Sequence, residues 1–224
     1  MKRLGTCLGF LLIAMFVGSA LALAETQYTP EQEYLFNIIQ SRRTVRKYKS
    51  TAVPKEHILK ILDAARMAAT AGNQQPWKFL VIKDKEKLTR LKEELLNWNL
   101  EAYKEKMKPS AEALEKAREA SRKYFDGALS APVYVAVLVD TKANYPDFIL
   151  YDGTLAAGNL MLAARALGYG TGFFTFLPED KAKAFFKIPE QYKLICFVPI
   201  GVPEEWPPTP PKKSLEEVVL FESF

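Results

Sequence analysis

The sequence has few of the residues that build metal sites and nucleophilic active sites. Its 224 residues include one histidine, His57, and two cysteines, Cys7 and Cys196. A zinc site made of histidine and cysteine is therefore excluded. A protease triad would need His57, but that residue lies in an ordinary amphipathic run, 54–68, and no G-x-S-x-G motif occurs elsewhere. We expect His57 to be a surface residue.

The chain also lacks a strong charge of one sign. Lys and Arg number 31 against 26 Asp and Glu, and the lysine-rich region 83–123 alternates with glutamates. Because a nucleic-acid-binding protein gathers its basic residues into a patch with aromatics between them, we expect no nucleic-acid partner. With 49% hydrophobic and 25% charged residues, the composition is that of a soluble globular protein with one core.

The N-terminus differs in composition from the rest. Two basic residues precede an apolar stretch, 8–21, and a small-x-small site ends at Ala24. This pattern predicts a Sec-type signal peptide over 1–24 and an exported, periplasmic domain over 25–224. The alternative is an uncleaved membrane anchor. Cleavage would leave Cys196 as the last cysteine, so no intrachain disulfide could form.

Hydrophobic periodicity divides the remaining chain into helices and strands. Helices are predicted at 30–40, 54–68, 85–107, 111–125, 147–167 and 179–186. Short apolar runs predict strands at 77–82, 133–139, 171–176 and 194–200, of which the β-branched run 133–139 is typical of a sheet interior.

The C-terminal segment combines a stiff part with an apolar part. Five prolines follow Gly201, and they favour an extended segment that is hard to fold back. Residues 215–224 are largely apolar again. Such a tail is most simply explained if it packs on a neighbouring subunit.

Three arginines, Arg42, Arg43 and Arg46, lie just past the first predicted helix. Their charges repel one another unless an anion or an acidic surface neutralises them. Guanidinium groups make two-point contacts with phosphate oxygens, and the Thr44 hydroxyl is a further donor. Arginines paired with surface carboxylates are the alternative.

Residues 70–77, Thr-Ala-Gly-Asn-Gln-Gln-Pro-Trp, combine small side chains with amides. Small residues let a backbone approach a ligand, while Asn73 and Gln75 present donors and acceptors together. Such a loop suits a heterocycle with mixed hydrogen-bonding edges, such as the flavin pyrimidine ring. The alternative is a turn whose amides cap the preceding helix.

The glycine-rich run 168–172 does not favour a Rossmann fold. It follows a predicted helix and enters a strand, which is the reverse of the dinucleotide-binding turn. We expect it to end the helix and to let the backbone cross closely over a neighbouring segment.

Four motifs, in this order, resemble the FMN-dependent nitroreductase family. They are Ser-Arg-Arg-Thr-Val-Arg at 41–46, Ala-Thr-Ala-Gly-Asn-Gln-Gln-Pro-Trp at 69–77, Ala-Ala-x-x-Leu-Gly-Tyr-Gly-Thr at 163–171 and Lys-Lys-Ser-Leu-Glu-Glu-Val-Val at 212–219. The resemblance spans nearly all of the chain after residue 24. It implies an α+β fold with a central, mostly antiparallel sheet flanked by helices. It also implies an intertwined homodimer with FMN at the subunit interface and the C-terminal tail crossing to the partner.

The resemblance also implies roles for particular residues. Arg42 and Thr44 would bind the FMN phosphate, with Arg43 in the same cluster and Lys212 or Lys213 completing the site.

Other roles concern the flavin ring. Arg46 would lie by the N1 and C2 carbonyl edge, where a fixed cation stabilises the anionic reduced flavin. Asn73 and Gln75 would hold the pyrimidine side, and the region of Thr70 would touch the flavin of the other subunit. The segment Phe174-Thr175 would pass flavin N5.

Two departures from the family pattern concern the residue that faces flavin N5 and the cover of the substrate pocket. The Gly-Gly that often follows the third motif is replaced by Thr175 and Phe176, so a Thr175 hydroxyl is an alternative to a main-chain amide at N5. The charged insert 85–125 is expected to cover the substrate pocket.

The function implied is that of an FMN-dependent oxidoreductase. It would pass hydride from NAD(P)H through flavin N5 to an electron-poor acceptor such as a nitroaromatic or a quinone, with no catalytic side chain. Alternatives are a flavin-dependent dehalogenase on the same fold, an exported non-catalytic FMN-binding or redox-sensing module, and an interaction protein without cofactor. Because nicotinamides are scarce outside the cytoplasm, another electron donor also stays open.

Overall fold

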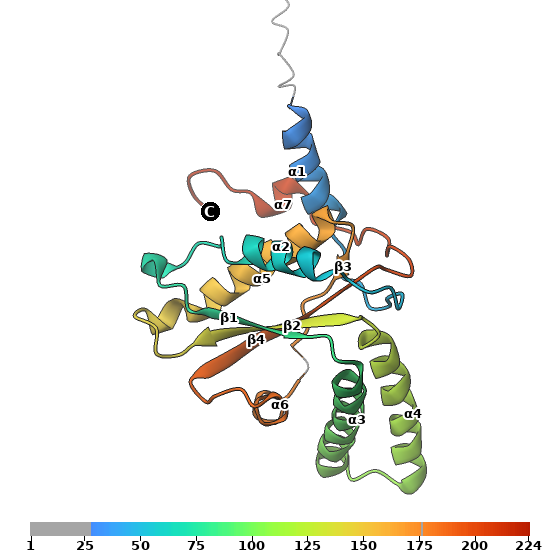
Figure 1. Cartoon of the computed structure of the whole chain (residues 1–224). Helices are drawn as coiled ribbons and strands as arrows, with labels where there is room; N and C mark the ends of the chain where they lie inside the picture. Colours follow the sequence, from blue (N-terminus) through green and yellow to red (C-terminus); the bar gives the residue numbers. More distant parts are fainter. Residues whose placement is uncertain (1–27, 176) are drawn as a thin grey trace, which may run out of the picture.

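The fold is built around one antiparallel sheet of four strands, seen in Figure 1, a view of the computed structural model. The structure describes residues 28–175 and 177–224. The predicted signal peptide, 1–24, therefore lies outside the described residues, as does Phe176. The strands, in the order β1-β2-β4-β3 across the sheet, are β1 (Trp77–Ile82), β2 (Val133–Asp140), β4 (Tyr192–Gly201) and β3 (Gly170–Thr171).

Helices cover both faces of this sheet (Figure 1). One face carries α2 (Lys55–Ala65) and α5 (Ile149–Ala166), and the other carries α3 (Lys85–Met107) and α6 (Glu179–Phe186). The remaining helical segments are α1 (Pro30–Ser41), α4 (Ala111–Ala128), α7 (Leu215–Val218) and the short 3-10 turns η1 (Ala71–Asn73) and η2 (Pro146–Phe148). None of the helices within the described ranges is long and apolar enough to cross a membrane.

The central position of β2 in the sheet explains why its sequence is apolar from Val133 to Val139. Tyr134, Ala136 and Leu138 join the core beneath α3 and α6. The alternate residues Val133, Val135 and Val137 join the core beneath α2 and α5. Because side chains alternate between the faces of a strand and both faces are covered, every position of this strand before the terminal Asp140 is apolar or aromatic. The prediction of an interior strand at 133–139 is confirmed.

Other predicted elements differ mainly at their ends. The helix expected at 54–68 ends at Ala65, and the one expected at 147–167 begins with a 3-10 turn before α5. The strand expected at 171–176 is wrong in extent, because β3 stops at Thr171. The physical reason lies at Gly172, where an added Cβ would be 2.8 Å from the ring of Phe174. The ring folds back over the glycine and interrupts the strand, and pairing with β4 resumes only as an isolated bridge between Phe174 and Phe197.

The glycine-rich run after α5 behaves as expected. Gly168 has φ of +83° and follows the last turn of the helix, where a left-handed residue satisfies the helix end. A Cβ on Gly170 would lie 2.6 Å from Cγ2 of Val45 and 2.8 Å from Cγ of Pro203. Three segments far apart in sequence therefore cross at Gly170.

We expect Gly170→Ala to lower the free energy of unfolding by about 1–3 kcal/mol, because overpacking here pushes two other segments apart. Urea denaturation measures this change. The matched control is Gly127→Ala, where the nearest atom to a new Cβ lies at 3.8 Å. Equal stability of the two variants would contradict the close crossing.

His57 is half-buried, which corrects the expectation of an ordinary surface residue. Its Nδ1 lies 2.7 Å from the hydroxyl of Tyr169, a residue that is 7% exposed. This contact links the start of α2 to the short loop that follows α5. Nothing in this arrangement presents His57 to a nucleophile.

Candidate functional site

The arginine-rich segment leaves α1 and runs along the edge of the sheet. The Val45 amide donates to the Thr171 carbonyl at 2.8 Å, and Thr44 forms a parallel bridge with Thr171. Val45 is 1% exposed, so its side chain enters the core. Because alternate residues of extended backbone share a face, Thr44 and Arg46 point away from that core.

Further bonds fix this segment to its surroundings. The Tyr48 hydroxyl donates to the Val45 carbonyl at 2.8 Å, and the Tyr48 amide donates to Oγ of Ser130 at 3.0 Å. Burial raises the pKa of Tyr48, so this residue stays a neutral donor. The backbone of the segment that carries the arginines is thus hydrogen-bonded to β3 at Val45 and to Ser130 at Tyr48.

A cavity of about 870 Å³ lies between this segment and the proline-rich stretch that follows β4. Its size is within the range of small-molecule sites. Twelve residues line it: Ile39, Gln40, Arg42, Arg43, Thr44, Arg46, Pro207, Pro208, Thr209, Pro210, Pro211 and Lys212. The structure therefore brings Lys212 to the arginine cluster, although the two lie far apart in sequence. Lys213 is exposed on the same stretch but is not among the lining residues.

The lining of this cavity favours an anion. Four of its residues are cationic and none is acidic. In the part of the chain that the structure describes, the ion pairs found involve other residues and not the three arginines. The alternative that these arginines pair with surface carboxylates is thus not supported. Guanidinium groups and a hydroxyl are the donors that a phosphate group requires, so the lining fits the FMN phosphate.

The amide-rich loop adopts strained backbone conformations. Gly72, Asn73 and Gln75 have φ of 52°, 55° and 50°. Left-handed conformations are costly for residues other than glycine and persist where the surroundings enforce them.

The enforcing residue is Asp152, near the start of α5, which is 3% exposed. Its carboxylate accepts the Ala71 amide at 3.1 Å and Nε2 of Gln74 at 2.7 Å. Gln74 in turn accepts the Tyr145 amide at 2.7 Å. Gln74 therefore faces inward, while Asn73 and Gln75 are exposed to solvent.

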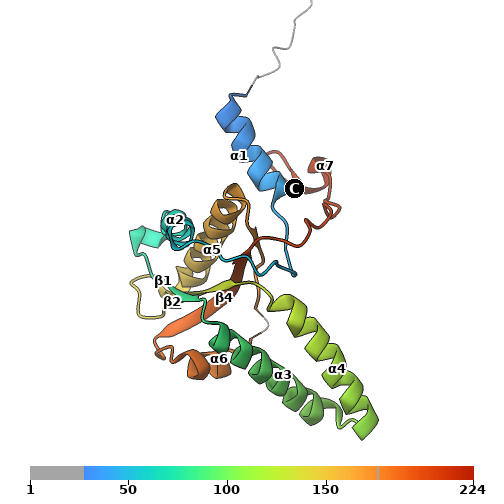
Figure 2. The same ribbon diagram turned by 45° about the vertical axis from the view of Figure 1, so that its right-hand side comes forward.

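The loop 70–76 and the segment 42–46, which lines the cationic cavity, lie at opposite ends of α5 (Figure 1, Figure 2). Asp152 contacts the loop, and Arg165 contacts Ser41 beside the arginine segment. At about 1.5 Å per residue, these two positions on the helix are roughly 20 Å apart. Within one chain, the structure does not bring Thr70, Asn73 and Gln75 to the arginines.

The segment after β3 carries the remaining predicted site residues. The Phe174 amide donates to the Phe197 carbonyl at 2.9 Å and is therefore used within the fold. The following residue, Thr175, is exposed. Nearby Cys196 is buried, which raises the pKa of its thiol to about 12 and makes it a poor nucleophile.

Sequence reasoning missed the residues that support the site. They are Gln74 and Asp152 at the loop, and Ser41, Arg165 and Trp206 near the cavity. The available signal was Asp152, a carboxylate in an otherwise small and apolar helical run. A buried carboxylate requires partners, and its helix position faces the loop.

Two helices expose wide apolar surfaces. No residue of α1 is buried, and Tyr34, Leu35, Phe36 and Ile39 are between 44% and 56% exposed. On α5, Phe148 before its first turn, Tyr151 and Leu155 are between 49% and 66% exposed. Exposed apolar surface on this scale marks a site of association.

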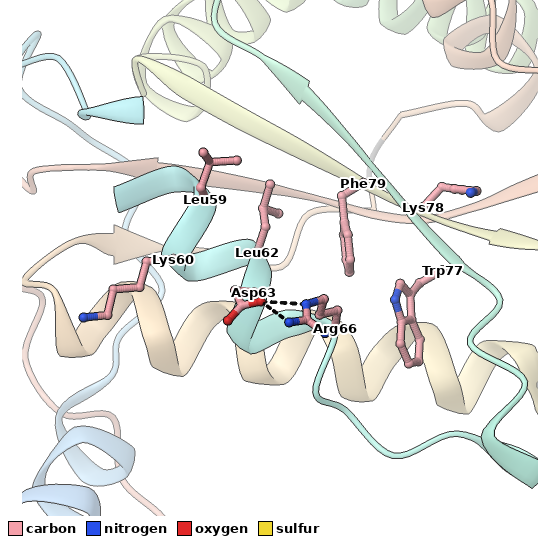
Figure 3. A pocket seen from close by; sticks show the side chains of 8 residues that line it. All are labelled: Leu59, Lys60, Leu62, Asp63, Arg66, Trp77, Lys78 and Phe79. Atoms are coloured by element: carbon pink, nitrogen blue, oxygen red, sulfur yellow. Dashed lines mark hydrogen bonds and ion pairs between the residues drawn. The ribbon is translucent and has the colours of Figure 1, made fainter. Parts of the chain in front are cut away.

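A second hollow, of about 680 Å³, lies at the outer edge of β1 (Figure 3). Leu59 and Leu62 from α2 face Trp77 and Phe79 from the strand. Basic residues surround this apolar floor: Lys60, Lys78 and Arg66, the last paired with Asp63. The hollow lies beside the edge strand of the sheet.

The fold is that of an α+β protein, and its cationic cavity fits a phosphorylated ligand. Residues 39–202 match the model of the nitroreductase family. The chain belongs to the nitroreductase family, as its motifs predicted.

Relatives within this family have different activities. The chain is 31% identical over 176 residues to a protein named as a candidate NADH dehydrogenase/NAD(P)H nitroreductase of Methanothermobacter thermautotrophicus, covering 76% of this chain and 78% of that one. It is 28% identical to an iodotyrosine deiodinase of Thermotoga neapolitana, covering 85% and 98%. The crystal structure of an oxidized iodotyrosine deiodinase bound to FMN and 3-iodo-L-tyrosine superposes with a TM-score of 0.69 at 23% identity, covering 85% and 100%. This similarity confirms the predicted fold.

Proposed function

We propose that the protein is an FMN-dependent oxidoreductase that carries reducing equivalents from NAD(P)H to an electron-poor acceptor such as a nitroaromatic or a quinone. One observation carries the proposal: the cavity in which the arginine segment and Lys212 converge. Family membership and the FMN bound in related nitroreductase structures support it.

Four of the cavity residues have distinct tasks in this proposal. Arg42, Thr44 and Lys212 hold the phosphate, while Arg46 places a fixed positive charge near the pyrimidine side of the ring. When bound, FMN supplies two-electron chemistry between nicotinamide and acceptor. The protein supplies binding, orientation and a positive field, so no side-chain nucleophile is required.

The complete site requires two copies of the chain. The loop with Asn73 and Gln75 lies roughly 20 Å along α5 from the cavity, so one flavin ring cannot contact both within a chain. One exposed apolar face belongs to α1, which leads into the cavity, and the other belongs to the start of α5, which contacts the loop. A twofold axis through them would bring the loop of one copy to the cavity of the other, because a symmetric interface exchanges the same contacts in both directions.

The C-terminal tail, 215–224, fits the hollow beside β1 of the partner. The tail is exposed, with Leu220 at 55% and Phe221 at 86%, and it is apolar with interspersed glutamates. The hollow offers apolar side chains within a basic rim and an unpaired strand edge. A strand added at such an edge gains backbone hydrogen bonds and side-chain pockets together.

Deletion of residues 215–224 is therefore expected to weaken the dimer at least about tenfold, since it removes several buried apolar anchors. Analytical ultracentrifugation over a concentration series measures this. The control is Lys213→Ala, a change on the exposed stretch that leaves the apolar tail intact. An unchanged dimerisation constant would place the tail outside the interface.

An absorption spectrum tests the proposed function. The chain from Glu25 onward is incubated with FMN, freed of excess and then mixed with NADH or NADPH without oxygen. We expect a flavin spectrum that bleaches. A flavin that stays oxidised with both donors would favour a sensor or another donor, and no flavin at all would contradict the proposal.

A second candidate function is reductive dehalogenation. It is favoured by Thr175, which is exposed where the neighbouring Phe174 amide is already used, so Thr175 offers donors toward N5 through its hydroxyl and its main-chain amide. The similarity to iodotyrosine deiodinases supports the same alternative. Turnover of 3-iodotyrosine against a nitroaromatic, in wild type and Thr175→Ala, distinguishes the two functions. Loss of dehalogenation alone in the variant would identify the dehalogenase.

We propose in addition that residues 1–24 direct export to the periplasm. Expression of the full chain followed by fractionation and mass measurement tests this. A periplasmic product that begins at Glu25 supports export with cleavage, and a full-length product in the membrane fraction supports an anchor.

A further inference from the structure

The stretch that carries Lys212 has little backbone support. We define residues 204–214 as the arm. Within the described residues, its backbone bonds to the body end at Glu204, whose amide donates to the Lys47 carbonyl at 3.2 Å. Four of the next seven residues are prolines, which have no amide proton to donate. Side chains must therefore decide where the arm lies.

Two arginines provide such contacts. Arg165, in the last turn of α5, donates from Nε to Oγ of Ser41 at 3.1 Å. Its guanidinium carbon lies 4.2 Å from the ring centroid of Trp206. This geometry is that of a cation–π contact, and it joins the arm to the end of α1 through α5.

Arg43 forms the second link. Its Nη1 donates to the carbonyls of Gln40 and Arg42 at 2.6 and 2.9 Å, and its Nη2 donates to Oγ1 of Thr209 on the arm. The Arg43 guanidinium therefore already donates hydrogen bonds to three acceptors within the protein. Arg42 and Arg46, by comparison, line the same cavity without hydrogen bonds of this kind among the described side chains.

We propose that Arg165 and Arg43 are positioning residues that fix the arm, so that Lys212 lies opposite Arg42 before the ligand arrives. Arg43 then acts on the phosphate through the arm and not as a direct ligand. The inference rests on the proposed FMN site. Its physical basis is preorganisation: an arm already ordered does not lose conformational entropy when the phosphate binds.

A different role for Arg165 has to be separated from this one. A cation in the last turn of a helix stabilises the helix dipole whatever its other contacts. Arg165→Lys keeps that charge but loses the planar group that stacks on Trp206 and the Nε that bonds to Ser41. The dipole role therefore predicts wild-type behaviour for Arg165→Lys, and the positioning role predicts the same defect as Arg165→Ala.

The test compares FMN with riboflavin, which lacks the phosphate. Dissociation constants are measured by flavin fluorescence for Arg165→Ala, Arg165→Lys, Trp206→Ala and Trp206→Phe. We expect the first three to weaken FMN roughly tenfold and riboflavin less than twofold, whereas Trp206→Phe retains most of the affinity because its ring still accepts a cation. An FMN affinity of Arg165→Lys equal to wild type, or an equal loss for both flavins, would overturn the inference.

The role of Arg43 is tested by changing Thr209, its hydrogen-bond partner on the arm. Thr209→Val removes the acceptor on the arm and leaves every charge of the cavity in place. We expect FMN to bind roughly three- to tenfold more weakly, with riboflavin unchanged. Unchanged FMN affinity would show that Arg43 does not act through the arm.

A measurement without flavin separates this inference from the proposed function. Trypsin cleavage at Lys212 and Lys213 reports how often the arm leaves the body. We expect cleavage about tenfold faster in Arg165→Ala and in Trp206→Ala than in wild type, and no further increase in the double variant. Equal rates in all four proteins would overturn the positioning role even if FMN binds. Faster cleavage in a protein that binds no FMN would instead contradict the proposed function alone.

Discussion

Arg42→Ala is expected to weaken FMN binding about 30- to 100-fold while leaving riboflavin affinity within about twofold. A charge-assisted, two-point hydrogen bond to phosphate contributes about 2–3 kcal/mol, and each 1.4 kcal/mol is a tenfold change. Arg42 is half-buried in the cavity lining and lies opposite Lys212. Fluorescence titration of both flavins measures the difference.

The matched control is Arg122→Ala, which removes an exposed arginine from α4. We expect its FMN affinity to equal that of wild type, since α4 lies on the other side of the sheet from α5. An equal loss for FMN and riboflavin in Arg42→Ala would show that this residue supports the fold and not the phosphate.

Asp152→Ala is expected to lower the free energy of unfolding by about 2–3 kcal/mol and to weaken FMN binding. The substitution removes the acceptor of the Ala71 amide and one of the two acceptors of Gln74 Nε2, which keeps its bond to the Tyr145 carbonyl. An unpaired donor costs about 1–3 kcal/mol when buried, and these two are only partly buried. Without the carboxylate, the loop that contains the left-handed residues Asn73 and Gln75 loses two of the bonds that hold it to α5.

Urea denaturation and flavin titration of Asp152→Ala test both effects. Asp147→Ala serves as the control, because this exposed carboxylate lies only five residues earlier in the chain. A change within about 0.5 kcal/mol is usual for such a surface substitution. If Asp152→Ala behaved like the control, the loop would be held by other contacts.

Much of the fold follows from local sequence. The interior strand β2 and the helices α3 and α6 are predicted because their periodicity is strong and their ends carry clear signals, such as Asp84 accepting the Lys87 amide at the start of α3. The early end of β3 could not be predicted, because it depends on how the ring of Phe174 lies over Gly172. Such packing is not encoded in any periodicity.

The candidate site was predictable in composition but not in arrangement. The resemblance implies a phosphate site formed by the arginine motif with Lys212 or Lys213, and the structure brings Lys212 to the arginines. The loop with Asn73 and Gln75 was expected at the same flavin, yet it lies at the far end of α5. The motifs alone do not reveal this separation, which agrees with the position of FMN at a subunit interface that the family resemblance implies.

The most direct test of a site shared between two chains is subunit complementation. One variant carries Arg42→Ala and the other carries Asn73→Ala with Gln75→Ala, and each alone is expected to have little FMN-dependent NADH oxidation. After unfolding and refolding as an equimolar mixture, half of the dimers are mixed, and each mixed dimer has one intact site. We predict recovery of about a quarter of wild-type activity. No recovery above the separate variants, with mixed dimers present, would contradict the shared site.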